Sequence, residues 1–225
     1  MSKRVIAITG GHGVLGRAVV EAALADGLKV AVIDHASGQS APEGVLELGG
    51  VDLTDPASAQ KAIDAVAAHF GRLDALLNIA GGFVWQTTDD ADPAWGRMFA
   101  LNLTTALNAG RAALPHLKAS PEGRIVNVGA NAALKSAAGM GAYAASKAGV
   151  HRLTESLAEE LKETSVTVNA VLPSILDTAQ NRKDMPDADP AKWVAPSDLA
   201  RVMLFLASPD SRAITGALIP VTGRV

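Results

Sequence analysis

The feature that most restricts how this chain can fold is a regular alternation of two kinds of segment. Short runs rich in β-branched residues alternate with longer segments rich in Ala and Leu, whose apolar residues recur at helical spacing. This alternation is typical of parallel strands joined by helices, because each connection must travel back along the sheet before the next strand begins. We therefore predict an α/β fold with one doubly wound parallel sheet of about seven strands and helices on both faces.

The same pattern gives approximate bounds for the elements. The length of 225 residues suits a single domain over 1–225. The helix near 55–70 has the clearest start, because Asp55 can cap it and Pro56 occupies its first turn. The expected strands are 4–9, 29–34, 44–51, 75–79, 124–128, 166–172 and 217–221, and the expected helices lie near 14–26, 55–70, 90–118, 142–163 and 197–207.

The segment 174–195 is the only long stretch without a clear helix or strand pattern. It follows the sixth predicted strand, and loops at the carboxyl ends of parallel strands border the ligand crevice of an open sheet. We interpret it as a substrate loop that covers the crevice. The alternative is an ordinary solvated loop, since the segment carries several charged residues.

Composition and charge exclude several classes of function. The 20 basic and 23 acidic residues give a formal net charge of −3 without a block of one sign, so nucleic acid and membranes are not expected partners. The absence of cysteine excludes disulfides, thiolate metal sites and a cysteine nucleophile, and it is consistent with the cytoplasm. The five histidines show no metal-ligand spacing, and the apolar run near the amino terminus is too short for a signal peptide. We expect a cytoplasmic protein that binds a small molecule and no metal.

A glycine-rich turn, TGGHGVLG over residues 9–16, joins the first predicted strand to the first predicted helix. Gly11, Gly13 and Gly16 match the spacing G-x-G-x-x-G, in which glycines allow a tight turn and a close approach of the backbone to a pyrophosphate. Free N–H groups at the start of the helix then face the phosphate oxygens. The expected cofactor-binding residues of this turn are Gly10, Gly11, Gly13, Val14, Leu15 and Gly16.

Asp34 ends the second predicted strand, and no arginine follows it. A carboxylate at this position can accept hydrogen bonds from the ribose hydroxyls of an adenosine, and it repels a 2′-phosphate. We therefore expect the site to take NAD(H), and NADP(H) less readily.

Tyr143 and Lys147 are four residues apart in a predicted helix, so their side chains lie on one face, one turn apart. At a separation of about 5 Å and an effective dielectric constant near 20, the ammonium would favour the phenolate by roughly 3 kcal/mol. We expect the pKa of Tyr143 to be lowered from about 10 towards about 8, close to the range in which a general acid or base works best. Tyr143 is the only tyrosine of the chain.

With these features in place, the chain resembles the short-chain dehydrogenase/reductase family over essentially its whole length. The resemblance rests on the glycine turn, on Asp34, on Tyr143 with Lys147, and on further matches in the same order as in the family. These further matches are Asp52-Leu53, Asn78-Ile79-Ala80-Gly81, Asn102, the segment 173–178 and Thr215-Gly216. The resemblance implies a Rossmann-like fold, hydride transfer with a nicotinamide cofactor, and a homodimer or homotetramer.

The resemblance also implies roles for individual residues. Tyr143 would donate or accept the proton, Lys147 would hold ribose hydroxyls and lower the tyrosine pKa, and Asn102 would support a water in a proton relay. These three are the expected catalytic residues. Besides the glycine turn and Asp34, the cofactor is expected to contact Asp52, Leu53, Asn78, Ala80, Gly81, Lys147, Pro173 and Thr178.

Within the family, the sequence is most similar to the quinonoid dihydropteridine reductases. The likeness is carried by the glycine turn, by residues 129–134, and above all by the run LPSILDTAQNRKDMPDADPAKW over residues 172–193. That run lies almost entirely within the expected substrate loop. It implies an NADH-dependent reductase of a planar conjugated substrate such as a quinonoid dihydropterin.

One departure from the family bears on the reaction. Most members carry a serine about 13 residues before the tyrosine, where this chain has Ala130 with Asn131 beside it. Removing a hydrogen-bond donor to the substrate oxygen typically costs about 10²–10³ in rate. Either the substrate does not need this donor, as a quinonoid dihydropterin would not, or Asn131 replaces it in a carbonyl reductase or alcohol dehydrogenase. A third alternative is a dinucleotide-binding regulatory protein without catalysis.

Four further residues are candidate substrate contacts beside Asn131. Phe83 and Trp85 follow the Ala80-Gly81-Gly82 turn and would form walls against a planar ring. Met185 and Trp193 lie in the expected substrate loop. Phe83, Trp85 and Trp193 could equally be packing residues.

Overall fold

The computed structural model describes residues 3–38, 42–92 and 94–225, and its strands form one parallel sheet. The strand order is β3-β2-β1-β4-β5-β6-β7, and every neighbouring pair runs parallel. The predicted doubly wound sheet of about seven strands is confirmed. The strands are β1 (Val5–Thr9), β2 (Lys29–Ile33), β3 (Leu46–Leu48), β4 (Ala75–Asn78), β5 (Arg124–Val128), β6 (Thr167–Pro173) and β7 (Leu218–Val221).

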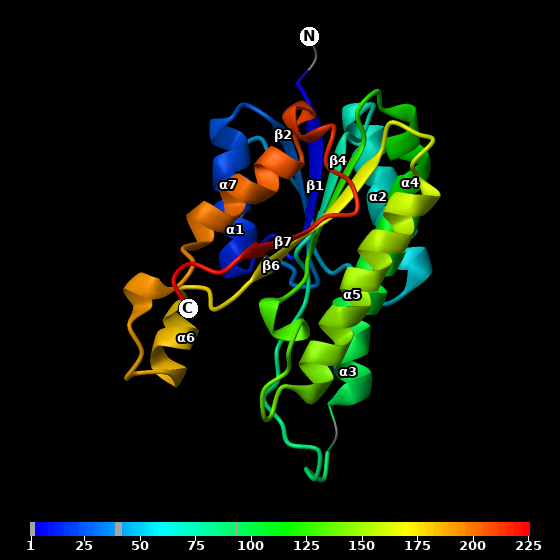
Figure 1. The fold of residues 1–225 in the computed structure, drawn as a ribbon. Coiled ribbons are helices and arrows are strands. Elements are labelled where there is room, and N and C mark those ends of the chain that lie inside the picture. The colour runs from blue at the N-terminus through cyan, green and yellow to red at the C-terminus, as the bar shows by residue number, and fades with distance from the viewer. Residues whose placement is uncertain (1–2, 39–41, 93) are drawn as a thin grey trace.

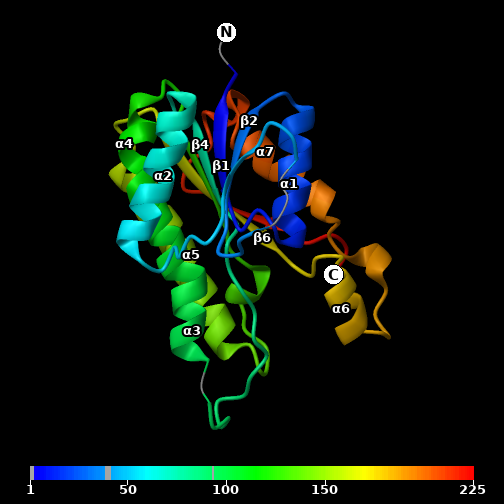
Figure 2. The same cartoon turned by 180° about the vertical axis from the view of Figure 1, so that it is seen from behind.

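Helices cover both faces of the sheet. Figure 1 shows α1 and α7 on one side and α2, α4 and α5 on the other, and the view from behind in Figure 2 agrees. Within the described ranges, no helix is long and apolar enough to cross a membrane. The helices are α1 (Val14–Ala25), α2 (Pro56–Phe70), α3 (Trp95–Phe99), α4 (Thr105–Ala119), α5 (Gly141–Glu160), α6 (Ala179–Asp184) and α7 (Pro196–Leu206).

The central strand β1 shows why the sheet needs two helical layers. All five of its residues are buried. Val5 and Ala7 belong to the core beneath α2, α4 and α5, whereas Ile6 and Ile8 belong to the core beneath α1 and α7. Side chains alternate between the faces of a strand, so an unbroken apolar run requires cover on both sides.

The helix expected near 90–118 begins later and contains an irregular turn. It consists of α3, a π-helical turn over Ala100–Thr104, and α4, while residue 93 lies outside the described residues. The π turn contains the buried side chain of Asn102. Such wide turns occur frequently at functional sites, and an apolar period of 3.6 residues does not reveal them.

The strand expected at 44–51 is reduced to β3, which among the described strands pairs with β2 alone. The backbone turns away after this strand at Gly50, whose φ of 72° lies in the left-handed region that favours glycine. β3 is therefore a short edge strand, which limits the backbone groups left open at this side of the sheet.

The sequence pattern indicated no helix or strand in the segment 174–195, but the structure shows that part of the segment is regular. It contains α6 and a 3₁₀ turn over Pro190–Lys192. The α6 sequence AQNRKD has no apolar face, so it produces no helical periodicity. Instead, local hydrogen bonds define the helix: Thr178 Oγ1 accepts from Asn181 N at its start, and Arg182 pairs with Asp177 at 2.6 Å.

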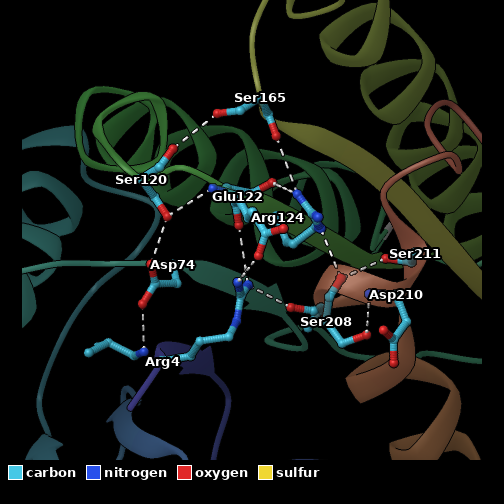
Figure 3. Close-up of polar contacts among 12 residues, drawn as sticks. Arg4, Asp74, Ser120, Glu122, Arg124, Ser165, Ser208, Asp210 and Ser211 are labelled. Carbon is cyan, nitrogen blue, oxygen red and sulfur yellow. Dashed lines mark hydrogen bonds and ion pairs between the residues drawn. The ribbon is translucent and has the colours of Figure 1, made fainter. Parts of the chain in front are cut away.

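A polar network holds the amino ends of the strands together (Figure 3). The buried carboxylate of Asp74, just before β4, accepts hydrogen bonds from Val5 N at 2.9 Å and Ser120 Oγ at 2.7 Å. It also accepts from Arg72 Nη2 at 2.6 Å. Burial alone would raise the pKa of Asp74, yet these hydrogen bonds and the Arg72 charge hold it below its ordinary value. The network therefore joins the starts of β1, β4 and β5.

The buried Arg124 extends this network to the start of β6. Its guanidinium donates to the carbonyl oxygens of Ser208 at 3.1 Å, Gly123 at 2.8 Å and Ser165 at 3.3 Å (Figure 3). The network thus fixes the amino ends of these strands relative to one another. The loops at the carboxyl ends therefore follow strands whose positions are fixed.

The carboxyl edge of the sheet contains the topological switch point. From β1 the chain order runs through β2 to β3 on one side, whereas β4 lies on the other side of β1. In open α/β sheets, ligands bind outside the carboxyl ends of the strands at such a point. The functional site is therefore expected where β1 and β4 end.

Candidate active site

A cavity of about 620 Å³ lies at the carboxyl ends of β1 and β4. Segments that follow β1, β2 and β4, the end of β5, and side chains of α5 line it. The cavity thus brings together residues that are more than a hundred positions apart in the sequence. The predicted site residues that line it are Gly10, Gly13, Val14, Leu15, Gly16, Asp34, Asp52, Leu53, Ala80, Gly81, Phe83, Tyr143 and Lys147.

The glycine turn is packed too tightly for side chains at three of its positions, Gly10, Gly11 and Gly16. Gly10 has a φ of 67°, and a Cβ there would lie 2.8 Å from Ala80 N. A Cβ on Gly16 would overlap the carbonyl oxygen of Gly10. Gly11 does not line the cavity, because it packs against Val32 of β2. The turn therefore places the start of α1 directly at the cavity.

The start of α1 is a suitable place for a diphosphate. Gly13 is its N-cap residue and has no side chain to occupy the first N–H groups. These groups and the helix dipole favour an anion, and the glycines leave the space that it would need. Val14, Leu15 and Gly16 of this first turn line the cavity. The residues present therefore fit the phosphate part of a dinucleotide.

Asp34 follows β2 and lines the cavity with its carboxylate held in place. Its Oδ2 accepts a hydrogen bond from His12 N and its Oδ1 accepts one from Ala36 N, both at 3.0 Å. Each carboxylate oxygen has a second lone pair for a further donor. The carboxylate is thus fixed beside the glycine turn and can still accept from ribose hydroxyls.

Asp52 and Leu53 line the same part of the cavity as Asp34, since Val51 N donates to Asp34 O at 3.0 Å. Hydrogen bonds from Thr54 Oγ1 and Thr54 N to Asp52 Oδ1 lower the pKa of Asp52. In the described part of the chain, no three His, Asp or Glu side chains converge on a point where they could hold a metal ion.

Tyr143 and Lys147 face the cavity from α5, as their spacing predicted. Lys147 is 4% exposed, and its Nζ donates to Val128 O at 2.7 Å. Burial lowers the pKa of Lys147 to about 8 and raises the pKa of Tyr143 to about 12. The expected lowering of the tyrosine pKa is therefore wrong for the polypeptide by itself, because burial disfavours the charged phenolate.

Asn102 is buried and lies behind the cavity lining. Its Oδ1 accepts from Gly82 N at 2.9 Å, and its Nδ2 donates to Gly82 O at 3.1 Å and to Ser146 Oγ at 3.0 Å. Ser146 Oγ in turn donates to Tyr143 O at 2.7 Å. Asn102 therefore connects the loop after β4 to the helix that carries the tyrosine, and its role in a water relay stays a prediction.

Asn78 also points away from the cavity. Its Nδ2 donates to Asn127 Oδ1 at 2.9 Å, and Asn127 Nδ2 donates to Thr154 Oγ1 at 2.9 Å. The backbone that follows Asn78 is fixed separately, because Thr9 Oγ1 accepts from the N–H groups of Ile79 and Ala80 at 3.1 Å. The side chain of Asn78 therefore orders the interior between β4 and α5, whereas the residues after it form the cavity wall.

Among the candidate substrate contacts, Phe83 lies in the cavity wall with 53% of its surface exposed. Its ring packs edge-on against Tyr143, with 5.0 Å between ring centroids and 84° between ring planes. Trp85 lies outside the lining and covers the backbone of Gly139. An exposed aromatic ring beside the phenol is suited to a planar substrate.

The other candidates lie outside the cavity lining. Asn131 begins a 3₁₀ turn after Ala130, and Met185 directly follows α6 as its C-cap residue. Trp193 is buried and packs against Gly223. Pro173 is the last residue of β6, and Thr178 caps α6.

Sequence reasoning missed several cavity residues. Leu176 lines the cavity at the base of the predicted substrate loop, where it forms a β-bridge with Val194. Hydrophobic residues of this kind give no chemical signal in a sequence, whereas Gly82 directly follows the motif Asn78-Ile79-Ala80-Gly81. The remaining lining residues that were not predicted are Ile33, His35, Val51, Thr54, Ile79, Gly82, Leu101, Thr105 and Val128.

A glycine turn that leads into a helix, a carboxylate after β2 and a Tyr–Lys pair thus face one cavity. The family model described as short chain dehydrogenase matches residues 4–189. The chain belongs to the short-chain dehydrogenase family. It is therefore an oxidoreductase of a family that uses NAD(H) or NADP(H), as its sequence predicted.

Characterised relatives cover almost the whole chain. The 3-oxoacyl-[acyl-carrier-protein] reductase MabA of Mycobacterium tuberculosis is 34% identical over 98% of this chain and 92% of the relative. The 2-(S)-hydroxypropyl-CoM dehydrogenase 3 of Xanthobacter autotrophicus is 32% identical over 99% and 96%, respectively. Neither is a dihydropteridine reductase, so the closer likeness to those enzymes stays a prediction.

Solved structures of the same family share the fold. Aldohexose dehydrogenase of Thermoplasma acidophilum in ligand-free form superimposes with a TM-score of 0.89 at 26% identity, covering 99% of this chain and 93% of the other. A 3-ketoacyl-(acyl-carrier-protein) reductase of Brucella melitensis complexed with NADH gives a TM-score of 0.86 at 26% identity, covering 98% and 97%.

Proposed function

We propose that the protein is an NADH-dependent reductase of a planar conjugated substrate such as a quinonoid dihydropterin. The observation that carries the proposal is the pairing of Tyr143 with the exposed ring of Phe83 in the cavity, while Ala130 carries no hydroxyl. An ordinary ketone gains from a second donor to its oxygen. A conjugated quinonoid ring accepts hydride more readily and needs only a proton at a ring nitrogen.

The proposed division of labour follows from the cavity. When bound, the nicotinamide cofactor supplies the hydride. The glycine turn holds its diphosphate, and Asp34 and Lys147 accept and donate hydrogen bonds at its ribose hydroxyls. Burial raises the pKa of Tyr143 to about 12, so the phenol is protonated at neutral pH and can donate its proton to the substrate. The ammonium of Lys147 then stabilises the phenolate that is left.

A substrate comparison tests this proposal. Purified protein should oxidise NADH with quinonoid dihydropterin, and kcat/KM with a 3-oxoacyl thioester should be at least about 100-fold lower because the second donor is missing. The measurement is NADH absorbance, with a blank without protein to correct for direct reaction. Faster reduction of the thioester would contradict the proposed substrate. NADH binding without turnover of any carbonyl or pterin substrate would favour the regulatory alternative.

A carbonyl reductase is the second candidate, and the names of the relatives favour it. In that case Asn131 would have to supply the missing donor from the turn that follows Ala130. Asn131→Ala would then remove most of the activity, by about 10²-fold or more. Under our proposal the same variant keeps its rate with the dihydropterin, whereas Ala130→Ser increases the rate with ketones.

The carboxylate of Asp34 leads to a prediction about which of the two dinucleotides binds more tightly. We expect NADH to bind at least about tenfold more tightly than NADPH, because the fixed carboxylate repels the 2′-phosphate. Asp34→Asn removes the charge and should reduce this ratio about tenfold. Fluorescence titration of each cofactor measures it.

Glu47→Gln is the matched control for the Asp34 variant. Glu47 contacts His12 at 3.2 Å and does not line the cavity, so its charge should not affect the ratio. Equal affinities of the wild-type protein for NADH and NADPH would contradict the role of Asp34.

A further inference from the structure

α5 carries a third buried titratable side chain on the face that bears Tyr143 and Lys147. His151 follows Lys147 by four residues, so it lies one helical turn further along. It is 2% exposed and does not line the cavity. The proposed reaction assigns no role to it.

The ring of His151 is directed at the turn after β5. Its Nε2 accepts a hydrogen bond from Ala130 N, with 3.3 Å between the two nitrogens. A Cβ on Gly129 would lie 2.5 Å from the same Nε2 and 2.7 Å from Cδ2. The imidazole can therefore reach the backbone only because residue 129 has no side chain.

The contact requires one protonation state of the ring. Nε2 can accept a hydrogen bond only when His151 is neutral and its proton is on Nδ1. Burial lowers the pKa of His151, and the positive charges of Arg152 and Lys147 lower it further. The ring is therefore neutral at neutral pH, as the contact demands.

Three consecutive residues of the turn are each held by a different partner. Val128 O accepts from Lys147 Nζ at 2.7 Å, Gly129 N donates to Val171 O at 2.9 Å, and Ala130 N donates to His151. Val128 and Lys147 line the cavity. If Ala130 N loses its acceptor, the turn can shift and carry with it the carbonyl that fixes the Lys147 ammonium.

We propose that His151 is a positioning residue, which holds Ala130 N and thereby fixes the Val128 carbonyl that directs the Lys147 ammonium into the cavity. The kinetic consequence rests on the proposed function. The consequence for dinucleotide affinity does not need a substrate, because Lys147 lies in the cavity wall.

The test compares two substitutions that differ in the acceptor. His151→Gln keeps an acceptor near the position of Nε2, whereas His151→Leu removes it at similar volume. For His151→Leu we expect NADH affinity to fall about fivefold and kcat about tenfold, with the substrate KM nearly unchanged, because a buried N–H loses its partner. His151→Gln should restore both values to within about threefold of wild type.

If His151 had only a structural role, His151→Leu and His151→Gln would both have a lower melting temperature. The NADH affinity and kcat of the folded variants would then equal those of the wild type. If His151→Leu does not fold, His151→Asn replaces it, since its side chain is too short to reach Ala130 N. Wild-type NADH affinity and kcat in the variants that lack the acceptor would overturn the proposal. If the wild-type protein does not reduce the dihydropterin, the proposed function fails, and the comparison of NADH affinities still decides the role of His151.

Discussion

Replacement of Tyr143 by Phe is expected to lower kcat about 10³-fold, since a positioned general acid contributes roughly 10²–10⁴ in rate. The substitution removes only the phenol oxygen. It keeps the ring, which packs edge-on against Phe83 at 5.0 Å, so the shape of the cavity is preserved. NADH affinity should therefore change less than about twofold. NADH absorbance at saturating substrate gives kcat, and fluorescence titration gives the affinity.

Phe83→Leu is the matched control, because it removes the ring contact and leaves the phenol. It should raise the substrate KM and change kcat less than about threefold. Tyr143 is the only tyrosine, so the loss of all tyrosine absorbance verifies the variant. A Tyr143→Phe protein that keeps more than about a tenth of the wild-type kcat would show that another group donates the proton.

The pH profile of the wild-type enzyme should show the titration of Lys147. The Tyr143 pKa of about 12 keeps the phenol protonated at neutral and mildly alkaline pH. The Lys147 pKa of about 8 means that the ammonium loses its proton as the pH rises through this value. The rate of reduction is therefore expected to be level below a pH of about 8 and to fall above it. A fall only on the acid side would contradict this assignment.

The architecture could be predicted because each strand and most helices carry their own local pattern. In β1 the unbroken run VIAIT already requires cover on both faces. The pattern failed for α6, whose helix depends on a cap and an ion pair rather than on an apolar face. It also failed for the π turn before α4, because one extra residue in a turn leaves the composition unchanged.

The site was predictable where the chemistry depends on the backbone position directly after a strand. Asp34 and the glycine turn are of this kind, and both line the cavity. Asn78 and Asn102 are different, because their amides turn towards partners from distant segments. The partner of Asn78 is Asn127, 49 residues away, and that of Asn102 is Ser146, 44 residues away. Nothing in the local sequence indicates such partners.

The pKa of Tyr143 shows a further limit of reasoning from spacing. The four-residue interval correctly predicts that phenol and ammonium share a face of α5. It does not predict how much solvent each group loses, and burial moves the two pKa values to about 12 and about 8. For a proton donor this outcome is favourable, since the phenol stays protonated at neutral pH.

Gly16→Ala is expected to weaken NADH binding about 100-fold, which corresponds to about 2.7 kcal/mol. The added Cβ would overlap the carbonyl oxygen of Gly10 and would lie 2.7 Å from Gly11 Cα. Both are backbone atoms, so the clash cannot be relieved by rotating a side chain, and the turn must open. Overpacking of this kind typically destabilises the folded state by about 1–3 kcal/mol. Binding of the diphosphate needs the closed turn, so the strain appears as lost affinity.

Gly96→Ala separates this clash from the general effect of alanine in a helix. Gly96 lies in α3, and a Cβ there would meet nothing within 4 Å. Because alanine is favoured over glycine in a helix by about 1 kcal/mol, this control should be as stable as wild type or slightly more so, with unchanged NADH affinity. Gly16→Ala should instead lower the melting temperature, and urea titration should give it a lower free energy of unfolding than Gly96→Ala. Equal NADH affinity in the two variants would show that the turn yields without strain and that the diphosphate does not depend on its closed form.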